Sequence, residues 1–388
     1  MTAEPVSEAI PAHGRLVVKV GSSLLVDDQG RLRRTWLKTL CRRLAGRAGQ
    51  LVLVSSGAIA LGRGVLGLAH RPRALAEAQA AAAVGQIHLA GAWSEVWAEQ
   101  GCTAAQVLLT LGDLEQRRRY LNARATLEML LARGIVPVVN ENDTVATEEI
   151  RFGDNDRLAA RVAQLLGAER LVLLSDVDGL YTADPAADPQ ARRIERVDAL
   201  TPQIEALAGG TGRSGLGTGG MTSKLAAVRI AVEAGVSVVL SSGRTDDPIG
   251  DLCRGGPSTY FAACTQPLAA RKRWLRGLQD PRGELLLDAG ALRAVEQGAS
   301  LLAVGVREVR GTFGRGDLVR LVGSEGPCGQ GLSSYESADA QRIAGLDSQR
   351  IAEVLAEAGR GPLVHRDDLV LFSNRTRIEQ EDAGDERT

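Results

Sequence analysis

The sequence has few cysteines and histidines and no long apolar run. Its 388 residues include five cysteines and four histidines, which are scattered and form no CxxC pair or Cys/His cluster. This pattern excludes a disulfide framework and a zinc site, and it predicts that the cysteines are buried free thiols. No apolar stretch approaches the roughly 18 residues of a membrane span, and the first residues lack the basic and apolar regions of a secretory signal. We therefore expect a cytoplasmic protein that does not contact a membrane.

The sequence also lacks an excess of charge of either sign. Lysine and arginine together number 46, aspartate and glutamate number 47, and the formal net charge is −1. Because nucleic-acid binding depends on a basic field, the chain as a whole is not expected to bind nucleic acid. The hydrophobic share of 44% and the charged share of 24% are typical of a globular protein. The length predicts two or three domains.

Lysine is scarce. Only four of the 46 basic residues are lysines, namely Lys19, Lys38, Lys224 and Lys272, and the other 42 are arginines. A lysine kept beside glycines in such a sequence indicates a position where a compact point charge is needed, as on a phosphate group. Lys19 and Lys224 fit that description, whereas Lys38 and Lys272 do not.

Short apolar runs alternate with helical patterns from residue 15 to residue 267. This alternation predicts an α/β fold in which an open, mostly parallel sheet is covered by helices on both faces. Ligands of such sheets bind beyond the carboxyl ends of the strands. The predicted strands cover residues 16–20, 51–54, 104–109, 135–139, 171–174 and 236–240, and the predicted helices cover residues 34–48, 74–100, 113–133, 154–166 and 222–234.

Outside this large domain the composition changes. Residues 1–14 read as a disordered leader, and residues 268–281 as a linker with a basic run at 271–276. Short segments rich in Gly, Val and Leu predict a small β-rich module over residues 282–360. The polar residues 361–388 read as a C-terminal tail.

A glycine-rich segment is the strongest local signal. Seven of the twelve residues from 209 to 220 are glycines, and the segment leads into a predicted helix whose first turn contains Lys224. Such a segment can bring backbone N–H groups and a helix N-terminus to phosphate oxygens. A flexible linker is the alternative. No Walker A motif is present, and the two G-x-G-x-x-G matches lack the acidic residue of a dinucleotide site. Together with Lys19, Lys224 offers two cations to a phosphoryl group.

Acidic and amide side chains gather at a predicted strand end and helix start. They lie in residues 140–143 and 153–156, and their oxygens suit a hard metal ion or an ammonium group. Turn formation and helix capping by Asp154 explain the same residues equally well. We assign no metal ligand among them.

In combination these motifs resemble the amino acid kinase family over residues 15–365. The segment with residues 288–291 and 311–317 is similar to the PUA module that some members of the family carry. The quoted motifs are Val18-Lys19-Val20-Gly21-Ser22-Ser23, Val54-Ser55-Ser56-Gly57-Ala58-Ile59, Val138-Val139-Asn140-Glu141-Asn142-Asp143, Phe152-Gly153-Asp154-Asn155-Asp156, Gly179-Leu180-Tyr181-Thr182-Ala183-Asp184-Pro185 and Gly217-Thr218-Gly219-Gly220-Met221-Thr222-Ser223-Lys224.

The resemblance points to the branch of the family that phosphorylates the side-chain carboxylate of L-glutamate with ATP, the first step of proline biosynthesis. It implies Mg²⁺ with the ATP, feedback inhibition by proline, a homo-oligomer and the downstream glutamyl phosphate reductase as a possible partner. It also implies roles for individual residues. The catalytic residues would be Lys19 and Lys224, which hold the phosphoryl group, and Asp156, which orients them. The glutamate-binding residues would be Ser56, Asp143 and Asn155. The residues at the nucleotide would be Lys19, Ser175, Asp176, Thr218, Gly219, Gly220, Met221, Thr222, Ser223 and Lys224.

Two alternatives remain open. Other members of the family act on acetylglutamate, aspartate, carbamate or a nucleoside monophosphate. PUA-type modules often bind RNA, which would make the C-terminal module an RNA-binding unit. Residues 282–360 contain nine arginines and eleven acidic residues, however, so we do not expect RNA as a partner.

Overall fold

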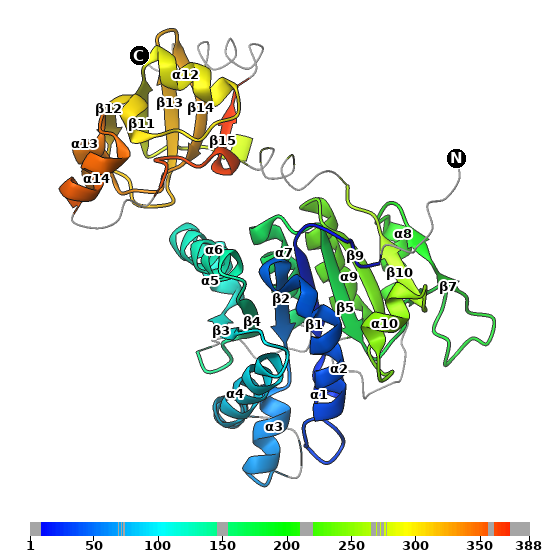
Figure 1. Cartoon of the computed structure of the whole chain (residues 1–388). Coiled ribbons are helices and arrows are strands. Elements are labelled where there is room, and N and C mark those ends of the chain that lie inside the picture. Colours follow the sequence, from blue (N-terminus) through cyan, green and yellow to red (C-terminus); the bar gives the residue numbers. More distant parts are fainter. Residues whose placement is uncertain are drawn as a thin grey trace. The chain divides into compact units, whose positions relative to one another are not determined.

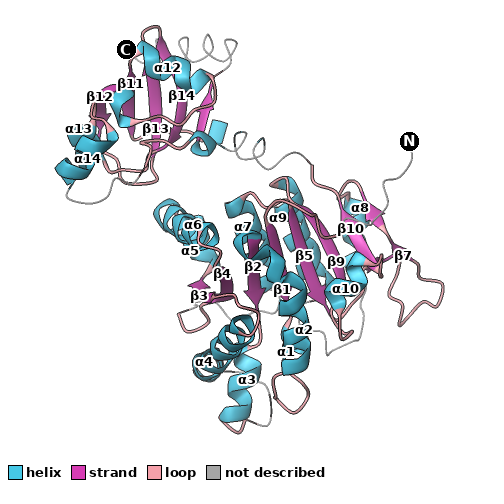
Figure 2. Cartoon of the chain, in the orientation of Figure 1, coloured by secondary structure: helices cyan, strands magenta, loops and turns pink. Residues whose placement is uncertain are grey.

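A computed structural model gives the fold of the chain (Figures 1 and 2). It describes residues 9–68, 70, 72, 74–145, 154–209, 220–264, 269, 272, 275, 276, 278–355 and 361–372. The chain divides into two compact units, Met1–Pro267 and Leu268–Thr388. Each unit is described by itself below.

The first unit is built on an eight-stranded sheet in the order β3-β4-β2-β1-β5-β9-β10-β8. Neighbouring strands among the described residues run parallel, except that β10 is antiparallel to β9. The predicted open, mostly parallel sheet is therefore confirmed. The strands are β1 Leu16–Val20, β2 Leu51–Ser55, β3 Ala104–Leu109, β4 Val136–Glu141, β5 Arg170–Ser175, β8 Arg196–Val197, β9 Ser237–Ser242 and β10 Ser258–Phe261.

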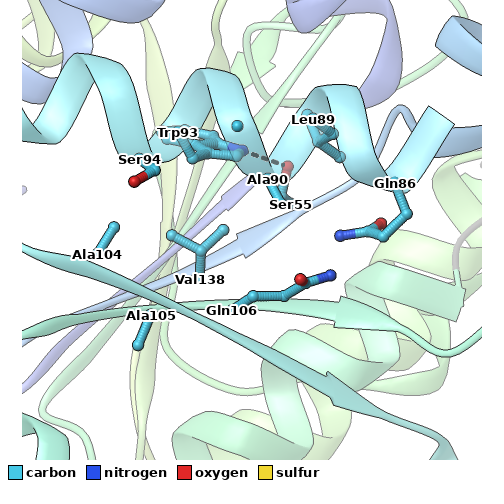
Figure 3. Close-up of a pocket in the computed structure, with 11 residues that line it drawn as sticks. Ser55, Gln86, Leu89, Ala90, Trp93, Ser94, Ala104, Ala105, Gln106 and Val138 are labelled. Carbon is cyan, nitrogen blue, oxygen red and sulfur yellow. Dashed lines mark hydrogen bonds between the residues drawn. The ribbon is translucent and has the colours of Figure 1, made fainter.

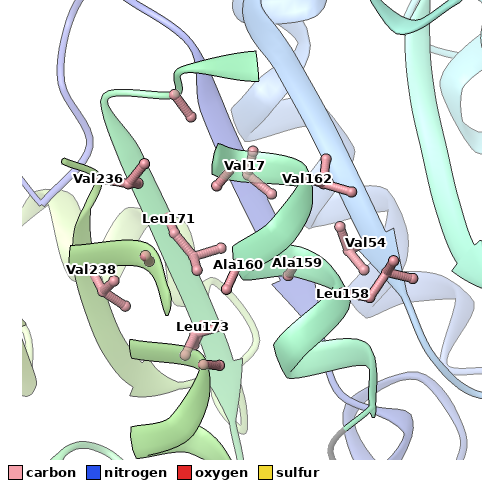
Figure 4. Close-up of a cluster of buried hydrophobic side chains, with 14 of the residues drawn as sticks. Val17, Val54, Leu158, Ala159, Ala160, Val162, Leu171, Leu173, Val236 and Val238 are labelled. Atoms are coloured by element: carbon pink, nitrogen blue, oxygen red, sulfur yellow. The ribbon is translucent and has the colours of Figure 1, made fainter. Parts of the chain in front are cut away.

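Helices cover both faces of this sheet, because successive side chains of its central strands enter two different cores. In β1, Val17 belongs to the core under α7 and α9, whereas Val18 belongs to the core under α2 and α4. Figure 4 shows the first of these cores, with α7 side chains such as Leu158 against those of the strands. The helices on that face are α5 Leu111–Glu115, α6 Arg117–Ala132, α7 Asp154–Leu166 and α9 Met221–Glu233, and those on the other face include α2 Arg34–Leu44, α4 Leu75–Ala98 and α10 Pro248–Cys253.

The main differences from the sequence prediction concern the helices over residues 34–48, 58–65 and 113–133. The predicted helix over residues 34–48 ends at Leu44, where a 3₁₀ helix with two glycines, Ala45–Gln50, takes over. The predicted helix over residues 113–133 is two helices, because Gln116 has an extended backbone between them. The residue that caps the first of these is Thr110, which forms a reciprocal capping box with Asp113. Helix α3, Ala58–Val65, was not predicted.

Smaller elements complete the first unit. They are α1 Ser22–Leu25, α8 Pro202–Ala206, the 3₁₀ helix Leu207–Gly209, and a two-stranded hairpin formed by β6 Leu180–Tyr181 and β7 Arg193–Ile194. No described helix combines the length and the apolar composition needed to cross a bilayer.

Residues 9–14, which the sequence analysis placed in a disordered leader, contact the body of the first unit. Ala9 is buried, and its carbonyl oxygen accepts a hydrogen bond of 3.3 Å from Arg170. The carbonyl oxygen of Gly14 accepts one of 2.8 Å from Arg47. Residues 1–8 lie outside the described residues.

The second unit has a five-stranded sheet in the order β12-β11-β13-β14-β15 and its own core, and its described residues include helices α12, α13 and α14. Strand β15 lies in the segment 361–388 that the sequence analysis placed in a tail, and it pairs with β14. Gln330 donates hydrogen bonds to the carbonyl oxygens of Leu275 and Leu278, which the sequence analysis placed in a linker. The elements are β11 Gly283–Leu287, α12 Ala289–Glu296, β12 Val306–Gly311, β13 Leu318–Gly323, β14 Gly326–Leu332, α13 Ser337–Ile343, α14 Ser348–Leu355 and β15 Leu369–Leu371.

All five cysteines are free thiols, but they are not all buried as the sequence analysis predicted. Cys41 and Cys328 are buried, Cys102 is half-buried, and Cys253 and Cys264 are exposed. Cys253 is the last residue of the short helix α10 and Cys264 follows the edge-proximal strand β10, so neither lies beneath a covering layer.

Candidate active site

The candidate site lies at the carboxyl ends of the central strands. Because β4, β2, β1, β5 and β9 are parallel, their carboxyl ends meet at one edge of the sheet. Lys19 in β1 pairs in register with Val54 of β2 and with Leu173 of β5. Two residues further along these neighbouring strands the chain reaches Ser56 and Ser175. Residues far apart in the sequence are thereby brought together.

A buried ion pair forms the centre of the site. Lys19 is in the same phase of β1 as Val17, so its side chain lies on the face covered by α7. Its Nζ is 2.6 Å from Oδ1 of Asp156, in the first turn of α7, and the two side chains are only 10% and 2% exposed. Charges this deeply buried are tolerated when they are paired. The pair therefore fixes both side chains at the edge of the sheet.

Lys224 joins this centre from the first turn of α9. It is 6% exposed, and burial is the main reason why its pKa is lowered from the ordinary lysine value. The nearby Lys19 lowers that pKa further, whereas Asp156 and Asp176 raise it in part. The ammonium groups of Lys19 and Lys224, which are far apart in the sequence, thus lie close enough to interact electrostatically. The structure brings together the three residues that the sequence analysis singled out as catalytic.

Two helices begin at this centre, and their N-termini add positive potential to it. Helices α7 and α9 each have thirteen residues and start beside the lysine pair. The residue before α9, Gly220, offers no side chain to cap the first turn of the helix. The first N–H groups of α9 are oriented as in anion-binding helix termini. Thr218 and Gly219 lie outside the described residues.

The end of β5 supplies a hydroxyl and a carboxylate. The Ser175 hydroxyl donates a 2.8 Å hydrogen bond to Oδ1 of Asp176. The carbonyl oxygen of Ser175 accepts one of 2.8 Å from the N–H of Gly243, which follows β9. Asp176 is half-buried and acts electrostatically on Lys224. The end of β5 therefore belongs to the same site.

The other predicted nucleotide residues of α9 have different surroundings. The hydroxyl of Thr222 donates to the carbonyl oxygen of Ala208 at 3.2 Å, and Met221 packs against the core under α9. Ser223 is half-buried, and its N–H donates to the carbonyl oxygen of Gly220 at 3.0 Å. Of this turn, Lys224 is the residue whose side chain enters the charged centre.

The predicted substrate residues lie at the same edge, on the side of β2 and β4. Oδ1 of Asn155 accepts a 3.3 Å hydrogen bond from the N–H of Glu141 at the end of β4. The N–H of Ser56 donates to the carbonyl oxygen of Val20 at 3.2 Å, which holds the end of β2 against β1. Asp143 is half-buried and lies two residues beyond β4. A ligand at this edge would have Ser56, Asp143 and Asn155 around it.

Sequence reasoning singled out Asn140 within residues 140–143 but missed the supporting network that it forms with Gln86. Asn140 is 2% exposed; its amide donates a 2.6 Å hydrogen bond to Oε1 of Gln86 in α4, and its Oδ1 accepts from the N–H of Glu141 at 3.0 Å. The network connects α4 to the loop that carries Asp143. Asn140 directly follows the apolar residues 136–139, which is why it was noticed, whereas nothing in the helix pattern indicated Gln86.

A cavity of about 310 Å³ lies beneath α4, on the sheet face opposite Lys19 (Figure 3). Nε1 of Trp93 donates a 2.9 Å hydrogen bond across it to the Ser55 hydroxyl, and the amides of Gln86 and Gln106 lie at one end. None of the predicted site residues that the structure describes lines this cavity. The lysine pair and the cavity are therefore separate features.

The charged centre suits a polyphosphate and does not form a complete metal cage. Among the residues that the structure describes, no group of three or more His, Cys, Asp or Glu side chains is placed to hold a metal ion. Asp156 is engaged by Lys19, which leaves Asp176 as a carboxylate of the centre beside Lys224. One carboxylate together with phosphate oxygens is a donor set that Mg²⁺ accepts.

The chain matches known proteins over both units. The model of the amino acid kinase family matches residues 14–242, and that of the PUA domain matches residues 283–355. The chain is 51% identical over 383 residues to "Glutamate 5-kinase 1" of Rhizobium meliloti, covering 97% of each chain. It is 54% identical over 361 residues to a glutamate 5-kinase of Dinoroseobacter shibae, covering 92% of this chain and 98% of the relative.

Two solved structures are more distant. The T. acidophilum isopentenyl phosphate kinase product complex is 19% identical with a TM-score of 0.44, covering 64% of this chain and 99% of its own. UMP kinase from Ureaplasma parvum is 14% identical with a TM-score of 0.43, covering 64% of this chain and 98% of its own.

Proposed function

The chain belongs to the amino acid kinase family, in its glutamate 5-kinase branch, and we propose on this premise that it transfers the γ-phosphoryl group of ATP to the side-chain carboxylate of L-glutamate. The observation that carries the proposal is the buried centre of Lys19, Asp156 and Lys224 at the start of two helices. This centre is built for a transferring phosphoryl group, whose charge is spread over several oxygens.

The chemistry needs positioning and charge neutralisation more than proton transfer. A carboxylate is ionised at neutral pH and is already a nucleophile, so no general base has to activate it. The obstacle is the approach of one anion to another, and the two ammonium groups lower that barrier by facing the phosphoryl oxygens. Asp156 keeps Lys19 in place through the 2.6 Å ion pair and interacts with Lys224.

The residues that bind the two substrates lie on different strands around this centre. Ser56, Asp143 and Asn155 bind glutamate on the side of β2 and β4. Ser175, Asp176 and the segment 218–224 contact the nucleotide on the side of β5 and α9. Mg²⁺ carried by ATP supplies further neutralisation of the phosphate charge, and Asp176 is the carboxylate that would hold it.

The biological setting is part of the proposal. The product, glutamyl 5-phosphate, is the first intermediate of proline biosynthesis, so we expect feedback inhibition by proline and a reductase that consumes the product. We also expect a cytoplasmic homo-oligomer. The C-terminal unit has a structural or regulatory role in this view, because its slight acidic excess does not favour RNA.

One assay tests the function directly. ADP release is measured with ATP and L-glutamate, with and without proline, and then with acetylglutamate, aspartate, carbamate or a nucleoside monophosphate in place of glutamate. We expect ADP release with glutamate as the acceptor and none with the other acceptors. Turnover with another acceptor, and none with free glutamate, would assign the chain to a different branch of the family.

A further inference from the structure

A buried threonine outside every sequence motif holds the segment that follows β5. Thr259 lies in β10 and is completely buried. Its hydroxyl accepts a 2.8 Å hydrogen bond from the N–H of Leu180 and donates one of 2.6 Å to the carbonyl oxygen of Ile194. Leu180 and Ile194 are cross-strand partners at the base of the β6–β7 hairpin. One hydroxyl thus joins both strands of the hairpin to the main sheet.

This contact is one of two anchors on either side of a short loop. At its start, the carbonyl oxygen of Ser175 is held by the N–H of Gly243, directly after β9. At its end, the N–H of Leu180 is held by Thr259. Both anchors come from the β9–β10 pair, so the path of residues 176–179 is set by that pair. Asp176, whose charge acts on Lys224, lies within this span.

The loop is also braced from inside. The Tyr181 hydroxyl is 3.1 Å from each carboxylate oxygen of Asp178, and burial, followed by this contact, raises the pKa of Tyr181. Arg193 of β7 lies 3.9 Å from the same carboxylate. The hairpin therefore fixes Asp178 while Thr259 fixes the hairpin.

Gly179 is explained by the same contact. A Cβ atom at this position would lie 2.6 Å from Oγ1 of Thr259 and 2.9 Å from Cδ of Arg193. A side chain there would push the hydroxyl away from Leu180. Close approach to Thr259 and Arg193 thus accounts for a glycine in the Gly179-Leu180-Tyr181 motif.

Thr259 is on the face of the sheet where the nucleotide is expected. Its register partner in β9 is Leu240, a member of the core under α7 and α9. Lys19 and Lys224 are on this face as well. The loop held by Thr259 is therefore next to the charged centre and not on the side of Ser55 and Trp93.

We propose that Thr259 is a positioning residue for the nucleotide of ATP, acting through the Leu180 N–H and the loop that presents Ser175 and Asp176. The inference rests on the proposed phosphotransfer from ATP. It adds a residue that touches neither substrate. Thr259 supports the nucleotide side of the site, so its loss should affect the binding of ATP and leave the glutamate side, on β2 and β4, unchanged.

The experiment compares Thr259→Val, which keeps the shape and removes the hydroxyl, with Thr259→Ser, which keeps the hydroxyl. We expect Thr259→Val to raise the KM for ATP, and the Kd for ADP measured by calorimetry, on the order of tenfold, because the loop at residues 176–179 loses its anchor at the Leu180 N–H. The KM for glutamate should stay within about twofold. Thr259→Ser should restore the wild-type values, and Gly179→Ala should reproduce the effect of Thr259→Val.

Ser237→Ala is the matched control. Ser237 is also a buried hydroxyl with two hydrogen bonds, accepting from Arg170 and donating to Glu169, but it lies at the amino end of β9. Its loss should lower the melting temperature without changing either KM. A Thr259→Val enzyme that behaves like this control, or that raises both KM values equally, would show a purely structural role and overturn the inference.

The binding measurement separates this inference from the proposed function. A wild-type protein that binds ATP and ADP, weakened by Thr259→Val, but does not turn over glutamate would retain the inference and reject glutamate as acceptor. A wild-type protein that turns over glutamate, with nucleotide affinity unchanged in Thr259→Val, would retain the function and reject the inference. Absence of nucleotide binding by the wild type would reject both.

Discussion

At the scale of single residues, Lys224 concentrates the chemistry. Its ammonium group is buried, and its lowered pKa means that the fold destabilises the charged form relative to the unfolded chain. A group with this cost is retained only if something else favours its charge. In the proposed function the negative charge of the bound phosphoryl group favours the ammonium form of Lys224 during the reaction.

Lys224→Met should therefore separate activity from stability. The substitution keeps the length of the side chain and removes the charge. We expect kcat to fall at least on the order of a hundredfold, about 3 kcal/mol of lost transition-state stabilisation. The melting temperature should not fall, because the electrostatic cost of the buried ammonium disappears.

Lys38→Ala is the control for that measurement. Lys38 is also a lysine in an ion pair, with its Nζ 2.8 Å from Glu99, but both side chains are 47% exposed. Exposed pairs contribute little, so kcat and melting temperature should both stay close to wild type. A Lys224→Met enzyme with kcat within threefold of wild type would contradict the role of Lys224.

The pKa of Lys224 also predicts a pH profile. Because the pKa is lowered in the free enzyme, kcat/KM for ATP should decline on the alkaline side below about 10.4, where an exposed lysine loses its proton. In the complex the charge of ATP favours the ammonium form, so the same decline in kcat should move to higher pH.

Lys224→Arg checks the assignment of this decline. Arginine keeps its charge over the whole range, so the alkaline decline in kcat/KM should disappear even if the overall rate is lower. Persistence of the same decline in the arginine variant would mean that another group titrates.

At the scale of elements, α3 and α4 pack closely through two glycines, one in each helix. A Cβ at Gly62 would overlap the carbonyl oxygen of Ala81, and one at Gly85 would overlap that of Ala58. The two helix backbones therefore touch, and Ala58 is the first residue of α3, two positions after Ser56. The packing of this helix pair sets the position of the end of β2.

Gly85→Ala should disturb both stability and the glutamate side of the site. We expect a loss of about 1–3 kcal/mol in the free energy of unfolding by urea, as in other overpacked contacts. The KM for glutamate should rise more than the KM for ATP, because α3 begins beside Ser56. Equal rises in the two KM values would place the damage elsewhere.

Gly91→Ala is a matched control on the same helix. A Cβ at Gly91 meets no atom within 4 Å. Alanine in a helix interior is favoured over glycine by about 0.5–1 kcal/mol, so this variant should be slightly more stable and keep both KM values.

The elements that sequence predicts are those with a strong local pattern. Runs such as Leu16–Val20 and Leu51–Ser55 are mostly apolar and are buried along their whole length, so the parallel sheet was predictable. Helix α3 was missed because Gly62 and Gly64 read as glycines of a loop, and the role of Gly62 is visible only once α4 lies against it. The break at Gln116 has no proline or glycine to announce it.

The same distinction applies to the candidate site. Lys19 and Lys224 stand out because lysine is scarce in this sequence, and they do share one buried centre. Gln86 and Thr259 have no such signal, since a lone polar residue in an alanine-rich helix or a short strand is common. Their partners, Asn140 and Leu180, are 54 and 79 positions away in the sequence, and only the tertiary fold brings them together.

At the scale of the whole molecule, the two units have separate cores. Among the residues that the structure describes, the clusters of buried side chains in Met1–Pro267 contain none from Leu268–Thr388, and the cluster of the second unit contains none from the first. All of the proposed catalytic and substrate residues belong to the first unit. The first unit should therefore be able to fold and catalyse without the second.

A chain that ends at Pro267 tests this expectation. We expect it to unfold cooperatively in urea and to release ADP in the presence of glutamate with a kcat within about threefold of the full chain, because the core and the charged centre are both complete. Lys224→Met in the shortened chain should lower that release by at least about a hundredfold, as in the full chain, which excludes a contaminating ATPase. A shortened chain that folds but has lost its glutamate dependence would mean that the second unit contributes to the site.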